Sequence, residues 1–205
     1  MKGLFDKYYE KYDSWYDNNK FAYLSEIKAL MKVVPAQGKG LEVGVGTGRF
    51  ASVLGIENGI DPSLKMINIA RKRGIKASLG LGEKVPFQPQ VFDYIAIVIT
   101  LCFVKDPGKV IGEAMRLLKR RGKLIVGIVD KESFLGKYYK SKKSVFYKNA
   151  RFFSVEGIVN LMKKAGFGKF AYYQTLFKLP EMMKRAENPR KGFGRGGFVV
   201  ISAEK

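Results

Sequence analysis

Short apolar runs alternate with amphipathic segments from residue 40 to residue 130, and this alternation constrains the fold more than any other feature. The run "VFDYIAIVIT", residues 91–100, is almost continuously apolar, which is typical of a strand that is buried on both faces. Strands that alternate with helices indicate βαβ units and a parallel sheet. We therefore expect an α/β fold with helices on both faces of a mostly parallel sheet.

Turn and capping residues give approximate boundaries to these elements. Pro62 suits the first position of a helix and Gly74 suits the position beyond its end. Gly122 is expected to stop a later helix. The helices of this half are expected over residues 47–54, 62–74 and 106–122, and the strands over 40–45, 58–61, 75–79, 91–100 and 123–129.

The two ends of the chain carry further elements. Residues 4–31 have helical spacing that is interrupted at Asn18 and Asn19. A later helix is expected to run from Ser154, a suitable N-cap, to Gly166. Closing strands are expected over residues 170–177 and 197–204, joined by a polar surface loop that is rich in Gly and Pro.

Composition limits the chemistry that the chain can perform. It has no histidine and one cysteine, Cys102, so an internal disulfide and the common zinc sites are excluded. A Ser-His or Cys-His nucleophile is excluded too. Any reaction must be undemanding in proton transfer, or it must use Asp, Glu, Tyr or Lys. No metal site is expected.

The charge balance is strongly basic, with 38 Lys and Arg against 18 Asp and Glu and a net charge of +20. Such a surface attracts polyanions, but it equally serves solubility. The N-terminus does not resemble a signal peptide, and the apolar run over 94–104 is shorter than the roughly 20 residues of a membrane helix. We expect a soluble cytoplasmic protein of one domain, residues 1–205.

A glycine-rich loop follows the first expected strand in "LEVGVGTGRF", residues 41–50. Its pattern is E-x-G-x-G-x-G, because the third glycine of a dinucleotide loop would fall at Arg49. Such a loop lets a nucleotide-like ligand approach the backbone, although tight packing alone also explains it. Asp61, which ends the next expected strand, can accept both ribose hydroxyls, cap the following helix, or do both.

Six segments follow one another in an order that resembles a known family. They are "LEVGVGTGRF", "GIDPSLKMINIARKRG", "GEKVPF", "VFDYIAIVITLCFVKDP", "EAMRLLKRRGKLIVGIVD" and "FFSVEGIVNLMKKAGF". Together they resemble the class I S-adenosylmethionine-dependent methyltransferases, and most closely the methyltransferase type 11 group. The resemblance covers residues 39–170. It implies a Rossmann-like sheet of seven strands with an antiparallel last strand, and S-adenosylmethionine (SAM) as cofactor, with S-adenosylhomocysteine (SAH) as product.

The resemblance also implies roles for individual residues. The glycine loop would lie along the methionine part of the cofactor, Asp61 would bind the ribose, and residues 81–83 would border the adenine. Many relatives carry an Asp in the adenine loop. This chain has Leu81 near that position instead. The implied cofactor-binding residues are Glu42, Gly44, Val45, Gly46, Gly48, Asp61, Pro62, Met66, Leu81, Gly82, Glu83, Thr100 and Leu101.

Methyl transfer from a sulfonium suits a chain without histidine, because the leaving group departs neutral and the enzyme supplies mainly alignment. We expect a SAM-dependent methyltransferase that acts on a small molecule. The alternatives are an RNA methyltransferase that uses the basic surface, and a binder of SAM without catalysis. Tyr16, Tyr23 and Asp130 are the candidate proton acceptors.

We expect four parts within the single domain. Residues 1–34 form a helical lid in which Tyr12, Trp15, Tyr16 and Tyr23 cover the cofactor, or else an ordinary amphipathic helix. Residues 39–130 form the cofactor-binding core. Residues 131–153 form a basic and aromatic insertion, suited either to single-stranded nucleic acid or to capping the substrate. Residues 154–205 contribute the last helix and strands.

Overall fold

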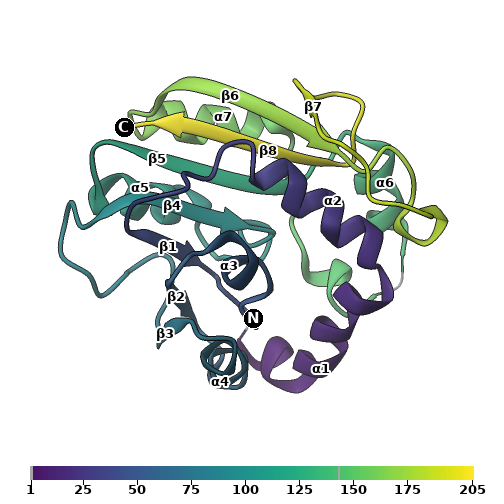
Figure 1. Ribbon diagram of the computed structural model, residues 1–205, viewed down its shortest axis with the longest axis horizontal. Helices are drawn as coiled ribbons and strands as arrows, with labels where there is room; N and C mark the ends of the chain where they lie inside the picture. The colour runs from purple at the N-terminus through teal and green to yellow at the C-terminus, as the bar shows by residue number, and fades with distance from the viewer. Residues whose placement is uncertain (1, 143) are drawn as a thin grey trace.

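The computed structural model describes residues 2–142 and 144–205, and Lys143 of the basic insertion lies outside them. Its centre is one mixed sheet with the strand order β3-β2-β1-β4-β5-β8-β6-β7 (Figure 1). The strands are β1 Gly40–Val43, β2 Asn58–Asp61, β3 Lys76–Leu79, β4 Phe92–Val98, β5 Leu118–Val129, β6 Gly168–Thr175, β7 Arg190–Lys191 and β8 Phe198–Glu204.

The first five strands are parallel, and β8 runs antiparallel between β5 and β6. This confirms the mostly parallel, Rossmann-like sheet with a reversed last strand. The sheet has eight strands and not seven, because Arg190 and Lys191 pair with Gln174 and Tyr173 of β6. These two residues belong to the segment that we expected to be only a surface loop.

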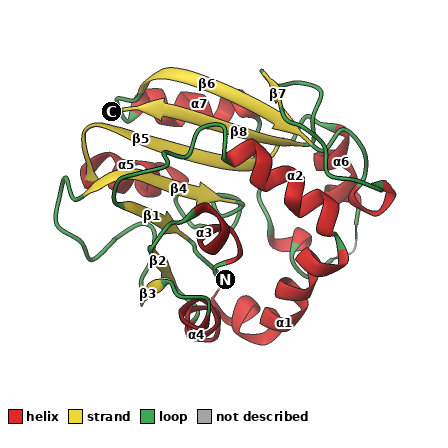
Figure 2. Cartoon of the chain, viewed as in Figure 1, coloured by secondary structure: helices red, strands yellow, loops and turns green. Residues whose placement is uncertain are grey.

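Helices cover both faces of the sheet (Figure 2). They are α1 Lys2–Asn18, α2 Lys20–Leu30, α3 Arg49–Leu54, α4 Leu64–Lys72, α5 Pro107–Leu117, α6 Phe134–Ser141 and α7 Val155–Lys164, with short 3₁₀ turns η1 Tyr147–Asn149 and η2 Pro180–Met182. In the described part of the chain, no helix is both long and apolar enough to cross a bilayer.

Two hydrophobic cores lie on opposite faces of the sheet. On the α5 face, α5 and α7 pack against strand residues such as Leu41, Ile95 and Leu124. On the other side, the α2 face, helices α1 to α4 and α6 pack against residues such as Ala96 and Val200. Side chains alternate along a strand, so central strands such as β4, β5 and β8 serve both cores.

Three expected helix boundaries were wrong. α3 begins at Arg49 and not at Thr47. α4 begins two residues after Pro62, because the Ser63 hydroxyl is the cap and accepts a hydrogen bond from the Met66 N–H at 3.3 Å. α5 ends at Leu117, five residues before Gly122. The chain becomes extended there because the fully buried Leu118 pairs with Phe92 in the sheet.

Candidate functional site

A cleft of about 1070 Å³ opens where β1, β2 and β4 end, at the carboxyl edge of the parallel strands. Ligands of open α/β sheets bind at this edge. Nine of the thirteen residues that the family resemblance implied for cofactor binding line the cleft: Gly44, Gly46, Asp61, Pro62, Met66, Leu81, Gly82, Glu83 and Thr100.

The glycine loop forms the floor of this cleft. Gly44 adopts φ +73°, a conformation that favours glycine. A side chain there would collide with Thr100, whose hydroxyl donates to the Val98 carbonyl at 3.0 Å. Gly48 has φ +81° and lies against Ala70 of α4. The glycines therefore allow the β1–α3 turn to pass close to β4 and α4, and they leave backbone exposed to the cleft.

Asp61 ties this loop to the end of β2. One carboxylate oxygen accepts from the Gly46 N–H at 3.0 Å and the other from the Ser63 N–H at 2.8 Å. Burial raises the pKa of Asp61 to about 6, against the lowering effect of these two amides. Asp61 does not cap α4 in the way that Ser63 does. Its carboxylate, which lines the cleft, has lone pairs left for further donors.

Four of the thirteen residues do not line the cleft and are buried beneath it. Val45 packs on Gly59, Gly48 precedes α3, and Leu101 is buried in the core of the α5 face. Glu42 is buried on the α2 face, because its neighbours Leu41 and Val43 point to the opposite core. Burial raises the pKa of Glu42 well above its usual range; the Ala51 amide opposes this and the Asp61 carboxyl adds to it.

Glu83 lines the cleft, but its carboxylate has structural partners. One of its oxygens accepts from the Lys105 N–H at 3.0 Å and from the Asp106 N–H at 3.3 Å. It thereby joins the loop after β3 to the loop before α5. Leu81 projects into the cleft and remains 57% exposed, so an apolar surface is available beside these backbone groups.

The N-terminal helix supplies the opposite wall of the cleft through Phe5 and Tyr12. Tyr16 is buried behind Tyr12, with the two hydroxyl oxygens 2.8 Å apart. Trp15 and Tyr23 pack against the core of the α2 face. Of the four aromatic residues expected to cover the cofactor, Tyr12 lines the cleft, whereas Trp15, Tyr16 and Tyr23 pack on the protein. The lid itself stays a prediction.

An ion-pair network holds α1 against the glycine loop. The Asp13 carboxylate accepts from Arg49 at 2.7 Å, from Arg73 at 2.8 Å and from the Thr47 hydroxyl at 2.5 Å. Burial alone would raise the pKa of Asp13, but these hydrogen bonds outweigh it and hold the pKa well below its usual range. The packing of α1 and the conformation of the glycine loop therefore depend on the same carboxylate.

None of the candidate proton acceptors reaches the lining of the cleft as far as the chain is described. Burial raises the pKa of Tyr16 well above its usual range, and that of Tyr23 to about 12. The Tyr23 hydroxyl donates to the Arg49 carbonyl at 2.6 Å. Asp130 is buried and accepts from the Glu132 N–H at 3.2 Å. Burial also raises the pKa of the Cys102 thiol, to about 12.

Several lining residues were not predicted. Phe103 and Lys105 lie in the loop after β4, within a segment that carries the family resemblance, and Lys109 lies in α5. Phe5 shares the aromatic face of the N-terminal helix, which was a usable signal. Arg151 reaches the cleft from the basic insertion, where its N–H donates to the Cys102 carbonyl at 2.9 Å. No local pattern distinguishes Arg151 from the other basic residues of this insertion.

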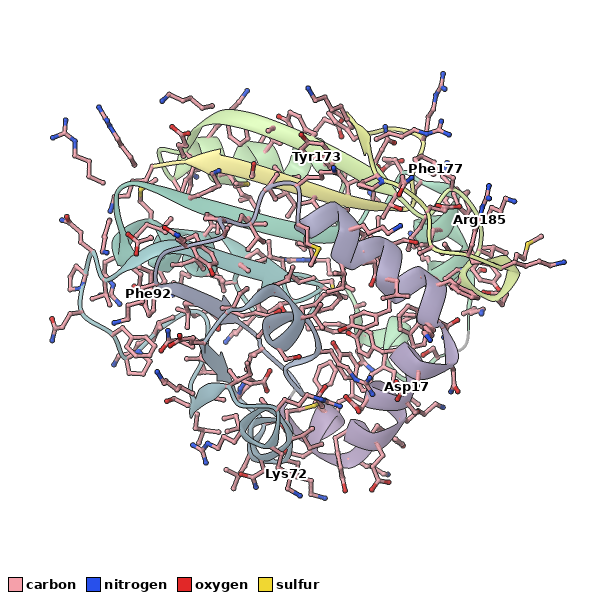
Figure 3. All side chains as sticks on the ribbon, viewed as in Figure 1. Asp17, Lys72, Phe92, Tyr173, Phe177 and Arg185 are labelled. Carbon is pink, nitrogen blue, oxygen red and sulfur yellow. The ribbon has the colours of Figure 1, made fainter. Side chains whose placement is uncertain are left out.

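A second cleft of about 890 Å³ lies under the connection between β6 and β8. It is lined by Lys28 and by residues of the 177–190 segment, most of them basic or apolar. In Figure 3, Phe177 and Arg185 lie far from Lys72, which belongs to the helix beside the first cleft. This second cleft shares no lining residue with the cleft at the glycine loop.

Comparison with known proteins agrees with this geometry. Residues 41–126 match the model of the family described as "Methyltransferase domain". A crystal structure of a SAM-dependent methyltransferase from Thermotoga maritima, described as a possible histamine N-methyltransferase, superposes with a TM-score of 0.97; the two sequences are 49% identical, over 100% of this chain and 99% of that one.

Two further relatives are similar in sequence. An uncharacterized protein of Methanocaldococcus jannaschii is 48% identical over 98% of both chains, and the demethylmenaquinone methyltransferase of Thermotoga maritima is 30% identical over 66% of each. The fold and the site define a class I methyltransferase. The chain belongs to the SAM-dependent methyltransferase family of the type 11 group, as its sequence predicted.

Proposed function

We propose that this chain transfers a methyl group from SAM to a small-molecule acceptor by in-line displacement. The observation that carries the proposal is the placement of the glycine loop and the Asp61 carboxylate in one cleft, at the ends of β1 and β2. Two relatives bear names of small-molecule acceptors, histamine and demethylmenaquinone, which supports a small-molecule acceptor over a macromolecule.

The residues of the cleft fit the parts of this cofactor. The backbone at Gly44 and Gly46 would hold the methionine part. Asp61 would accept hydrogen bonds from the ribose hydroxyls through lone pairs that Gly46 and Ser63 do not use. Met66 and Leu81 would pack on the adenine. Glu42, buried behind the loop with one oxygen that no described residue hydrogen-bonds, would attract the ammonium group.

When bound, SAM supplies a methyl group on a positively charged sulfur, which leaves as a neutral thioether. The protein then needs to align the acceptor and exclude water, and such alignment is worth up to roughly 7–11 kcal/mol. Phe5 and Tyr12 close one side of the cleft, and Asp13 holds their helix in place. We therefore assign α1 a positioning and shielding role, without a proton transfer of its own.

We also propose that residues 1–205 work as a single unit. In this scheme, residues 1–34 are the lid and residues 39–130 bind the cofactor. Residues 131–153 contribute α6, η1 and the aromatic side chains beside the lid. Residues 154–205 complete the sheet.

Calorimetric titration with SAH tests this function. We expect micromolar binding of SAH by the wild-type protein and no binding of NAD, since the loop lacks the dinucleotide pattern. Asp61→Ala removes charge-assisted hydrogen bonds worth about 1.5–3 kcal/mol, so affinity should fall roughly 10- to 150-fold. Absence of SAH binding to well-folded wild-type protein would overturn the proposal.

A further inference from the structure

The second cleft, under the connection between β6 and β8, carries an uneven charge. Five of its twelve lining residues in the described part of the chain are basic and one, Glu187, is acidic; the basic ones are Lys28, Lys178, Lys184, Arg185 and Arg190. In the whole chain, 38 of 205 residues are Lys or Arg. The lining is therefore more than twice as basic as the chain, and the overall charge alone does not account for it.

The cofactor cleft differs from the second cleft in this respect. Its lining contains three basic and three acidic residues, which are Lys105, Lys109, Arg151, Asp61, Glu83 and Asp106. A balanced lining suits a cofactor such as SAM, which carries charges of both signs. The second cleft has a clear excess of positive charge, so its lining favours an anion.

The positive charges of the second cleft have no carboxylate partners within residues 2–142 and 144–205. None of the five basic side chains takes part in an ion pair there. Glu187 is engaged elsewhere, because one of its oxygens accepts from the Phe177 N–H at 2.7 Å. Glu181, the other acid between β6 and β7, accepts from the Tyr138 hydroxyl and lies 3.6 Å from the Lys142 ammonium. The cleft therefore keeps a positive potential that only solvent and salt screen.

The segment that carries most of these charges is anchored to α2 and β6. The Glu187 N–H donates to the Ser25 hydroxyl oxygen at 2.8 Å, and the Lys28 ammonium donates to the Asn188 side-chain oxygen at 3.1 Å. Arg190 lies in β7, which pairs with β6. These contacts fix the backbone that carries the cations, so a ligand does not have to order it on binding.

Apolar surface lies beside the charges. Phe177 lines the cleft, and the Arg190 guanidinium carbon lies 4.6 Å from the centre of its ring. Met182 also lines the cleft and is 63% exposed. Aromatic rings and methionine side chains are suitable contacts for a planar organic group. The volume of about 890 Å³ is typical of small-molecule sites, so the cleft can hold charged groups and an organic body together.

We infer that the second cleft binds a small organic molecule with several phosphate groups, of the class of the nucleoside triphosphates. The guanidinium groups of Arg185 and Arg190 can each donate two parallel hydrogen bonds to a phosphate, and the lysines add point charges. Single-stranded nucleic acid offers the same phosphate chemistry, but the bounded volume of the cleft favours the free nucleotide. The site is separate from the cofactor cleft, so the inference does not depend on the proposed methyl transfer.

The test is calorimetric titration of the whole chain with GTP and UTP, at one low ionic strength. Guanosine, uridine, tripolyphosphate and a short single-stranded oligouridylate are the comparison ligands. We expect saturable binding of at least one triphosphate, and binding at least about tenfold weaker for its nucleoside, which lacks the phosphates. Tripolyphosphate lacks the organic body and should also bind more weakly. Affinity for the triphosphate should fall as NaCl is added, and excess SAH should leave it unchanged.

The double variant Lys184→Gln/Arg185→Gln removes two exposed cations that line the cleft. Triphosphate binding should weaken at least about tenfold, since a charge-assisted hydrogen bond is worth about 1.5–3 kcal/mol. Lys28→Gln, on α2, should weaken it in the same direction. The midpoint of urea denaturation should stay unchanged in these variants, because surface substitutions of this kind rarely affect stability.

The matched control is Lys72→Gln/Arg120→Gln, which removes the same charge from exposed positions outside both clefts. In Figure 3, Lys72 lies at the opposite end of the molecule from Arg185. The control should bind the triphosphate as the wild-type protein does.

The inference is overturned if neither triphosphate binds, if a nucleoside or tripolyphosphate binds as tightly, or if excess SAH displaces the triphosphate. Equal affinities of wild type and Lys184→Gln/Arg185→Gln would overturn it too, as would equal losses in that variant and the control. Oligouridylate that binds more tightly than both triphosphates would assign the cleft to nucleic acid instead. Failure of SAH to bind in a separate titration concerns the proposed function alone, so the two failures are distinguishable.

Discussion

The two faces of the sheet differ in what they bury. The core of the α5 face consists mainly of aliphatic residues, Phe and Met, with the partly buried Tyr172 packed against it. The α2 face buries tyrosines together with Glu26, Glu42 and Thr175. Polar groups without partners cost stability and are retained where they bind something. We infer that the core of the α5 face mainly supports the fold and that the α2 face carries most of the function, with the N-terminal end of α5 also bordering the cleft.

The largest effect should come from the supporting face. Ile111→Ala, at a fully buried position of α5, leaves a cavity in an apolar core and should lower the free energy of unfolding by about 2–5 kcal/mol. Urea denaturation measures this loss. SAH affinity should remain unchanged at a temperature where the variant is folded, and the exposed Val53→Ala is the control. A loss of SAH affinity in the folded variant would contradict the division between the faces.

In contrast to Ile111→Ala, the Glu26→Gln substitution should raise the free energy of unfolding. Burial raises its folded-state pKa well above the usual range, so the folded protein holds a proton that the unfolded chain releases. Wild-type stability should therefore fall as pH rises from about 4.5 toward the folded-state pKa, by at most about 1.4 kcal/mol per pH unit. The Glu26→Gln variant lacks this ionisable group, so its stability should not show this contribution to the pH dependence.

The advantage of Glu26→Gln over wild type should thus grow by about 2–3 kcal/mol between pH 5 and pH 7, provided that the folded-state carboxyl stays protonated throughout. Urea titrations of both proteins at several pH values measure the difference. A difference that is constant with pH would show that Glu26 ionises normally in the folded protein.

A smaller effect is expected where α1 is held on the α2 face. Asp13→Asn removes the charge that Arg49 and Arg73 share. The group is partly exposed, so we expect a loss of about 1–2 kcal/mol in helix docking, which increases the undocked population about 5- to 30-fold. Limited trypsin digestion within residues 2–18 should accelerate accordingly. Unchanged digestion would mean that aromatic packing alone holds the helix.

The smallest effect concerns pH and the cofactor. With a pKa of about 6 for Asp61 in the free protein, the ionised fraction falls about fourfold between pH 7 and pH 5.5. Affinity for SAH should fall by the same factor, because the ionised carboxylate is the better acceptor for ribose hydroxyls. Asp61→Asn should bind weakly with no such dependence. A wild-type affinity that is flat over this range would remove the carboxylate from the ribose site.

The sequence predicted the part of this site that is built from local patterns. The glycine loop and Asp61 follow strands that hydrophobic runs reveal, and parallel strands bring their carboxyl ends to one edge. It predicted the end of α5 poorly, because Leu118 is extended by pairing with a strand far away in the sequence. Glu26 gave no signal, since a glutamate among helical residues is ordinarily exposed. Its burial depends on how α2 packs against β6 and β8, which are far away in the sequence.

Hydrogen–deuterium exchange of the wild-type protein with and without SAH tests whether α1 and the glycine loop enclose the cofactor. We expect slower exchange with SAH in α1, in the glycine loop over residues 44–48 and in residues 80–83, all of which border the cleft. α7, which lies on the supporting face, should exchange at the same rate in both states. Protection of α7 comparable to that of α1, or bound SAH with no protection at the glycine loop, would contradict it.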